Sequence, residues 1–318
     1  MMRAEYREVT CRTGLNRVHG MPFRWSLNPY RGCVHRCQFC FASTTHQYLE
    51  LGDSAAFFGI ILVKTNLPEV LQEELGRRRR RELVAVGTAT DPYQPAEGRY
   101  RLTRRCLELF ARFRTPVSLV TKGTLVLRDI DVLQDLDRRG GVTVCLSIPT
   151  VDAEIWRRTE LGTPPPWQRL KVLERLVAAG LHAGVLLAPL LPGLSAMPEQ
   201  ITCTVRAAAE RGARFLRAQV LHLGPGVRDV FFGLLERDYP HLLAGYQQLY
   251  PGKYALPAYQ RRVEQRVAAA KAAVGYVAAT PRQPEAPVAY QLALPLPAGD
   301  SHAHPYAGRT GSRSNAGE

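Results

Sequence analysis

The sequence lacks any apolar stretch long enough to cross a membrane. Its longest apolar run, residues 184–191, is far shorter than the roughly 18 residues that a span requires, and proline and glycine follow it. Residues 1–7 also lack the apolar core and small-residue cleavage site of a signal peptide. We therefore expect no membrane association and a cytoplasmic location.

A disulfide framework is also missing. The chain has 7 cysteines, an odd number, in 318 residues, a length that needs no covalent stapling. In a reducing cytosol such cysteines are free thiols, metal ligands or reactive groups rather than disulfide partners.

Acidic residues are few relative to basic ones. Lys and Arg number 42 against 28 for Asp and Glu, and the net charge of +14 would hold nucleic acid or phosphorylated substrates near the surface. The excess is mostly arginine, which also serves as an ordinary helix-forming surface residue, so a nucleic-acid partner is one of two open interpretations. Because 46% of the residues are apolar, the chain can bury a core, which excludes disorder throughout.

Short runs rich in β-branched residues alternate with amphipathic stretches through most of the chain. The predicted strands are 24–28, 83–90, 116–121, 142–149, 183–190 and 214–222, and the predicted helices between them are 67–79, 102–113, 125–138, 167–179 and 198–211. This βα alternation predicts an α/β fold, a partial (βα)6 TIM-like barrel with ligands at the carboxyl ends of its strands. A doubly wound sheet is the rival fold.

The rest of the chain divides around this barrel. Residues 1–21 form an N-terminal segment, and 22–223 form the barrel. Helical patterns at 227–236, 240–249 and 259–274 predict a C-terminal helical cap over 224–279. From Thr280 the sequence is rich in Pro, Gly, Ala and Ser without an apolar period, so 280–318 is predicted to be a disordered tail.

Three cysteines lie within eight residues after the first predicted strand. Cys33, Cys37 and Cys40 have the spacing Cys-x3-Cys-x2-Cys in a polar loop. Thiolates bind soft metals and iron–sulfur clusters. A ferredoxin-type cluster uses four cysteines, whereas three would leave one iron open to a small ligand. The alternative is a structural zinc site with His35 or His46 as fourth ligand, although no second Cys-x2-Cys pair follows downstream.

These residues resemble the signature of the radical S-adenosylmethionine (radical SAM) superfamily, Cys-x3-Cys-x-aromatic-Cys, with Phe39 as the aromatic residue. Further strings are similar to the branch that contains spore photoproduct lyase and DNA-repair-photolyase-like proteins. They are Asn-Pro-Tyr-Arg-Gly-Cys at 28–33, Gly-Thr-Ala-Thr-Asp-Pro-Tyr-Gln-Pro at 87–95, Thr-Lys at 121–122 and Leu-Arg-Asp-Ile-Asp at 127–131.

The resemblance implies a function and its cofactors. It implies a 4Fe–4S cluster at the three cysteines that holds S-adenosylmethionine (SAM) on its open iron. Reductive cleavage of SAM then gives a 5′-deoxyadenosyl radical, which abstracts hydrogen from a substrate. An electron donor such as flavodoxin or ferredoxin is also implied. The substrate is not identified.

The resemblance also assigns SAM-binding residues. Thr90 is expected to contact the SAM amino group, Lys122 the carboxylate and Ser147 the ribose, while Phe39 backs the adenine through its main chain. Each position has an ordinary alternative: a surface lysine at 122, a packed polar residue at 147 and a strand residue satisfied by its neighbours at 90.

One thiol is expected to face the barrel interior. The period of two along 142–149 separates Thr143, Cys145 and Ser147 from an aliphatic face, so Cys145 could donate a hydrogen atom to a substrate radical or act as a small packing residue. Spore photoproduct lyase carries a quenching cysteine where 87–91 has none, which argues against repair of thymine photoproducts. A nucleic-acid repair lyase and a non-catalytic zinc or iron–sulfur nucleic-acid-binding module stay as alternatives.

Overall fold

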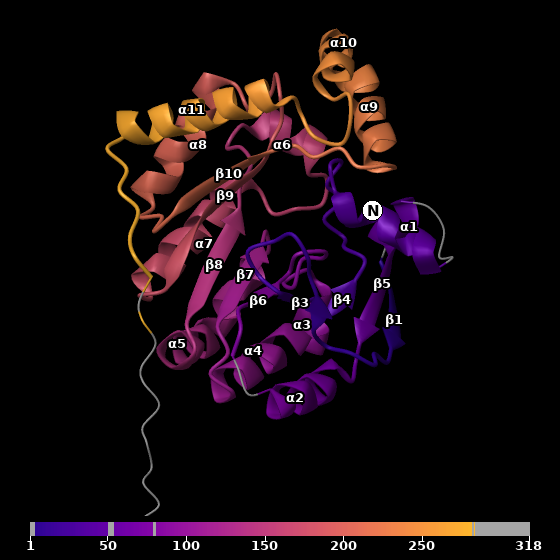
Figure 1. Cartoon of the computed structure of the whole chain (residues 1–318), viewed down its shortest axis with the longest axis vertical. Coiled ribbons are helices and arrows are strands. Elements are labelled where there is room, and N and C mark those ends of the chain that lie inside the picture. Colours follow the sequence, from indigo (N-terminus) through magenta and orange to yellow (C-terminus); the bar gives the residue numbers. More distant parts are fainter. Residues whose placement is uncertain (1–3, 50–53, 79–80, 282, 284–318) are drawn as a thin grey trace, which may run out of the picture. The chain divides into compact units, whose positions relative to one another are not determined.

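The protein is described from a computed structural model in which residues 4–49, 54–78, 81–281 and 283 are placed (Figure 1). A seven-stranded sheet has the order β10-β9-β8-β7-β6-β3-β2. Its strands are β2 (Asn16–Arg17), β3 (Trp25–Leu27), β6 (Val84–Val86), β7 (Val117–Thr121), β8 (Val142–Ser147), β9 (His182–Leu190) and β10 (Leu216–Val220). All neighbouring pairs are parallel except β2 with β3.

One face of this sheet carries the helices that connect its strands. These are α2 (Leu67–Arg77), α4 (Leu102–Arg112), α5 (Ile130–Arg139), α7 (Pro166–Ala178) and α8 (Pro198–Glu210). Figure 1 shows them along one side of the strands. Their apolar residues and alternate strand residues such as Val144 and Val185 form a single core cluster. The predicted partial barrel is confirmed, because a doubly wound sheet would carry helices on both faces.

The predicted second strand is too long at its carboxyl end. β6 stops at Val86, and residues 87–90 form bends. Gly87 has a φ of +86°, and a Cβ there would lie 2.3 Å from the Val120 carbonyl oxygen. The chain turns at this glycine, so the expectation that the strand continues to residue 90 and includes Thr90 is wrong.

Three strands form a second sheet that the sequence did not predict. β1 (Glu5–Val9) pairs in parallel with β5 (Ile60–Lys64), which pairs antiparallel with β4 (Tyr30–Arg31). β1 belongs to the predicted N-terminal segment and carries mostly charged residues, which hides its strand period. The remaining short elements are η1 (Phe41–Leu49), α1 (Ser54–Gly59), α3 (Ala96–Tyr100), η2 (Thr124–Asp129) and α6 (Ala153–Thr159).

The three helices expected after the barrel are present as α9 (Val227–Asp238), α10 (Pro240–Leu249) and α11 (Pro257–Ala273). α11 adds Val263, Val267 and Ala270 to the main core. α9 and α10 build a second cluster that also contains Cys37 and Phe39 of the cysteine loop. The predicted tail, 280–318, lies almost entirely outside the described residues.

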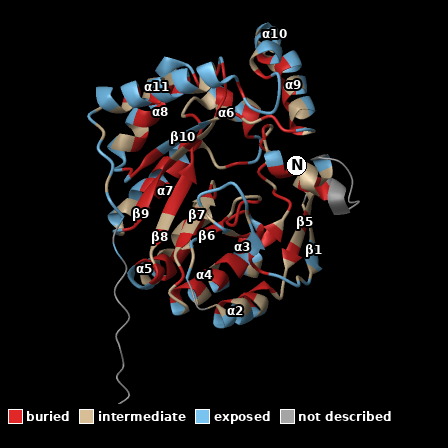
Figure 2. Cartoon of the chain, in the orientation of Figure 1, coloured by how far each residue is buried: buried red, intermediate tan, exposed pale blue. Residues whose placement is uncertain are grey.

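Burial follows this layering. Figure 2 shows buried residues concentrated in the strands, whereas the outer sides of the helices are exposed. The sheet face opposite the helices includes small and polar residues, such as Ala85, Ser118, Cys145 and Ser147. Within the described ranges, no helix is long and apolar enough to span a membrane.

Candidate functional site

The loop that carries Cys33, Cys37 and Cys40 follows β4 and is held on one side by the loop after β6. The Gln94 side chain is fully buried; its Nε2 donates to the Gly32 carbonyl over 3.0 Å, and its Oε1 accepts from Val34 N over 3.3 Å. These two hydrogen bonds hold the residues on either side of Cys33. The Cys33 N–H itself donates to the Phe57 carbonyl of α1 at 3.0 Å.

The segment after α6 holds the other side of the cysteine loop. Gln38 N donates to the Thr159 carbonyl and Gly162 N donates to the His35 carbonyl, both over 2.9 Å, and Cys37 and Glu160 form an isolated antiparallel bridge. A Cβ on Gly162 would lie 2.3 Å from the Val34 carbonyl oxygen. The two backbones therefore meet in a contact that only glycine permits.

The three cysteines are free thiols gathered in this loop. Cys33 and Cys37 are buried, and Cys40 is partly buried. Burial raises the pKa of Cys37, and it raises the pKa of Cys40 to about 12, with the charge of Cys33 acting in the same direction on both. In this part of the chain no three His, Cys, Asp or Glu side chains converge on one point where a single metal ion could sit. A cubane spreads its thiolate ligands over different irons, so its cysteines need not converge.

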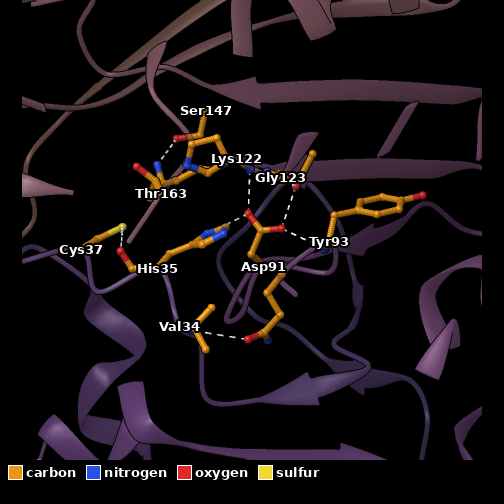
Figure 3. Close-up of polar contacts among 12 residues, drawn as sticks. Val34, His35, Cys37, Asp91, Tyr93, Lys122, Gly123, Ser147 and Thr163 are labelled. Atoms are coloured by element: carbon orange, nitrogen blue, oxygen red, sulfur yellow. Dashed lines mark hydrogen bonds and ion pairs between the residues drawn. The ribbon is translucent and has the colours of Figure 1, made fainter. Parts of the chain in front are cut away.

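A buried ion pair joins His35 of the cysteine loop to Asp91 of the loop after β6 (Figure 3). His35 Nδ1 is 3.3 Å from Asp91 Oδ2. Burial disfavours the charged imidazole, but Cys33 and Asp91 outweigh it and raise the pKa of His35 to about 10. Burial would also raise the pKa of Asp91, yet His35 and hydrogen bonds from Thr121 Oγ1 and Lys122 N lower it to about 2. Asp91 thereby fixes the end of β7, at Thr121 and Lys122.

Thr90 is tied to the cysteine-loop segment rather than left open. Its Oγ1 donates to the Tyr30 carbonyl over 3.1 Å, and Asn28 Oδ1 accepts from Ala89 N over 2.9 Å and from Thr90 N over 3.4 Å. Asn28 thus joins residues 28–33 to residues 87–95 through two hydrogen bonds, which accounts for an asparagine at position 28.

Three of the predicted SAM-binding residues come together. Lys122 Nζ donates to Ser147 Oγ over 2.5 Å (Figure 3) and lies 5.8 Å from the centre of the Phe39 ring. Lys122 directly follows β7, Ser147 ends β8, and Phe39 belongs to the cysteine loop. The Lys122 side chain is only 14% exposed, so it is not an ordinary surface lysine.

Two charged residues that the sequence analysis missed complete this site. Glu160 Oε1 is 2.9 Å from Lys122 Nζ, and Glu160 Oε2 is 2.8 Å from Arg169 Nη2. Arg169 is fully buried and also donates to the Ser147 carbonyl over 2.8 Å. Burial would raise the pKa of Glu160, but Arg169 and Lys122 lower it to about 2. The sequence feature that could have identified Arg169 is its position on the apolar face of α7, four residues before Leu173, where a charged residue needs a buried partner.

Cys145 lies on the sheet face opposite the helices. It pairs in register with Val120 of β7 and Gly184 of β9, and it is absent from the main core that holds its neighbours Val144 and Leu146. Burial raises the pKa of its thiol to about 11, with Arg217 and Ser118 acting in the opposite direction. The side chain is therefore a protonated thiol at neutral pH.

Residues 127–131 do not form the site; they hydrogen-bond to residues of the loop and helix that follow β6. Arg128 Nη2 donates to Glu97 over 2.8 Å, and Glu97 accepts from the Tyr30 hydroxyl over 2.5 Å. Asp129 accepts from the Tyr93 hydroxyl over 3.1 Å. This buried network fixes the loop that carries Asp91 and Gln94.

Comparison with known proteins identifies the family. Residues 27–201, which include the cysteine loop, Lys122, Ser147 and Arg169, match the family model of the radical SAM superfamily. The chain belongs to the radical SAM superfamily. The cysteine loop and the barrel strands from β6 to β9, with Lys122 and Ser147, are thus parts of a radical SAM domain.

This radical SAM protein has relatives across much of its length. It is 40% identical over 268 residues to the uncharacterized protein Rv2578c of Mycobacterium tuberculosis, covering 83% of this chain and 79% of the relative. It is 30% identical over 173 residues to the uncharacterized protein ORF301 of Acidianus two-tailed virus, covering 53% and 56% of the two chains.

The fold of this radical SAM domain is also that of spore photoproduct lyase. A structure of spore photoproduct lyase complexed with dinucleoside spore photoproduct matches with a TM-score of 0.66 at 14% identity, over 85% of this chain and 79% of the other. A mutant of the same enzyme with bound AdoMet and the same photoproduct matches with a TM-score of 0.66 at 15% identity. At such low identity the match establishes the shared fold.

Proposed function

We propose that this protein is a radical SAM enzyme that binds a 4Fe–4S cluster at Cys33, Cys37 and Cys40. When bound, the cluster and SAM would together supply a 5′-deoxyadenosyl radical for hydrogen abstraction from a substrate. The observation that carries the proposal is that Lys122, which follows β7, and Ser147, which ends the adjacent strand β8, lie together beside Phe39 of the triple-cysteine loop.

The chain's own residues bind and orient the cofactors in this proposal. Lys122 pairs with the SAM carboxylate, and Ser147 hydrogen-bonds the ribose. Phe39 supports the adenine through its main chain. Thr90 contributes to the amino-group site, with its hydroxyl already held by the Tyr30 carbonyl. Cys37 and Phe39 also pack into the cluster of apolar residues under α9, which limits the access of water to the loop.

Metal analysis tests the proposal. Anaerobically reconstituted protein is expected to contain about four irons and four sulfides per chain, because three thiolates hold a cubane with one open iron. Replacement of Cys33, Cys37 and Cys40 together by alanine should abolish both the iron and the broad brown absorbance, whereas Cys203→Ala, at an exposed thiol, should not. Iron retained by the triple variant would contradict the cluster assignment, and a zinc-binding module would contain no sulfide.

The substrate class divides into two candidates. We favour a substrate other than a thymine photoproduct, since 87–91 contains no cysteine to quench a product radical. A nucleic-acid repair lyase is the second candidate, supported by the net charge of +14 and by the fold shared with spore photoproduct lyase. In either case the reaction requires an electron donor, for which we propose flavodoxin or ferredoxin of the cytoplasm.

A further inference from the structure

We propose that Glu160 is a positioning residue that holds Lys122 ready for the SAM carboxylate and couples this lysine to the cysteine loop. The inference rests on the proposed function, because it assigns a role to Glu160 within the same SAM site. It concerns a residue that follows α6, outside the strand ends from which such sites are usually built.

The contacts of Lys122 define what remains available to a ligand. An ammonium has three donors. Among the described contacts of Lys122 Nζ, one donor is used by Ser147 Oγ at 2.5 Å and one by Glu160 Oε1 at 2.9 Å. The third donor is free for an incoming carboxylate. Two fixed contacts leave a long lysine side chain little freedom to lose when that carboxylate binds.

Because Arg169 also pairs with Glu160, Glu160 can hold Lys122 without neutralising the positive charge that would bind the SAM carboxylate. The Glu160 side chain is 1% exposed and that of Arg169 is 0% exposed, with 2.8 Å between Glu160 Oε2 and Arg169 Nη2. Two cations, Lys122 and Arg169, thus surround one carboxylate, and the group retains a single positive charge. A buried site with one net positive charge favours an anionic ligand.

The backbone of the same residue contacts the cysteine loop. Glu160 forms the antiparallel bridge to Cys37, and the flanking Thr159 carbonyl accepts from Gln38 N over 2.9 Å. One short segment therefore sets the position of Cys37 through its main chain and the position of Lys122 through the Glu160 carboxylate. Because SAM must reach both the cluster and Lys122, this segment fixes the distance that SAM has to span.

The test is SAM binding by Glu160→Gln in reconstituted full-length protein, measured anaerobically by isothermal titration calorimetry. A neutral amide can accept from Lys122 or Arg169 but no longer pairs with both cations, so Lys122 loses its fixed position. We expect the Kd for SAM to rise about tenfold with unchanged iron content. Glu154→Gln is the matched control, because Glu154 also pairs with an arginine, Arg158, but is 69% exposed.

A double-mutant cycle with Lys122→Met separates positioning from general structure. If Glu160 acts through Lys122, Glu160→Gln adds no further rise in Kd once Lys122 is methionine. An equal rise in both backgrounds, or an unchanged or lower Kd in Glu160→Gln alone, would overturn the proposal. Glu160→Asp keeps the charge for Arg169 while retracting the carboxylate from Lys122, so it gives the same test if Glu160→Gln does not fold.

The outcome also distinguishes this inference from the proposed function. Wild-type protein that carries a full cluster but binds no SAM would overturn both. Wild-type protein that binds SAM, with Glu160→Gln and Glu160→Asp binding it equally well, would overturn the role of Glu160 alone.

Discussion

At the scale of single residues, the site depends on side chains whose surroundings differ from those of ordinary surface groups. Lys122 is nearly buried and doubly paired, and Cys145 is a buried, protonated thiol on the sheet face opposite the helices. The first residue suits a fixed anion. The second retains the S–H bond that donation of a hydrogen atom would require.

Repair of a spore photoproduct would need a hydrogen-donating thiol, and Cys145 is the candidate outside residues 87–91. When a thymine dimer is opened by a radical, the resulting thymine radical must take a hydrogen atom from a nearby thiol, and 87–91 offers none. We therefore expect wild-type protein, with dithionite and SAM, to repair a spore photoproduct dinucleotide no faster than it releases 5′-deoxyadenosine without substrate. The measurement is chromatographic quantification of thymine and 5′-deoxyadenosine.

The contrary result would also be informative. Efficient formation of two thymines by the wild type, lost in Cys145→Ala, would establish Cys145 as the donor and support the repair lyase. Cys106→Ala is the matched control, because Cys106 is a fully buried thiol within the main core.

At the scale of elements, the cysteine loop is held between two segments that are distant in the sequence. Gln94 follows β6 and brackets Cys33, while the 159–162 segment follows α6 and pairs with the loop around Cys37. Neither segment needs to touch a cofactor to control where the three thiols lie. The geometry of the loop is therefore set by contacts that the Gln94 side chain and the backbone of residues 159–162 make with its main chain.

Gly162→Ala tests this contact. Its Cβ would lie 2.3 Å from the Val34 carbonyl oxygen and 3.2 Å from His35 backbone atoms, so the cysteine loop must shift. We expect a loss of about 1–3 kcal/mol in the free energy of unfolding, by analogy with overpacking, together with lower iron content after reconstitution. Urea unfolding and iron analysis give the two values.

Gly233→Ala provides the control for that substitution. Gly233 lies in α9, and a Cβ there meets nothing within 4 Å. The change should leave iron content unaltered and stabilise the helix by up to about 1 kcal/mol. Full iron content in Gly162→Ala would show that the loop does not depend on this close approach.

At the scale of the whole molecule, the C-terminal helix completes the barrel's outer core. β10 is an edge strand of the seven-stranded sheet, and α11 packs against α8 and β10. Val263 and Val267 of α11 join the same core cluster as Ile201 and Val205 of α8. A barrel that does not close leaves such an edge strand to be covered by a later segment of the chain.

Truncation of these valines tests the covering role. Val263→Ala and Val267→Ala should each lower the free energy of unfolding by about 1–3 kcal/mol, since both side chains are buried. Glu264→Ala, at an exposed position between them, should change it by less than about 0.5 kcal/mol. If all three variants unfolded at the urea midpoint of the wild type, α11 would not contribute to the core.

The sequence alone determined the βα alternation, the three cysteines and the residues at the strand ends. Apolar periodicity is a local property, so β7, β8, α4 and α8 lie within a few residues of their predicted ranges. The positions of Lys122 and Ser147 at the ends of parallel strands follow from the same local pattern, because adjacent parallel strands end at one edge.

Only the tertiary structure decided what surrounds these residues. Glu160 and Arg169 pair across a loop and a helix, and Gln94 reaches back about 60 residues to bracket Cys33. Thr90 is held by Tyr30 because the chain turns at Gly87 instead of continuing β6. Such contacts carry no period in the sequence. They depend on which loops the barrel brings together, and a buried charge is stable only where that folding supplies its partner.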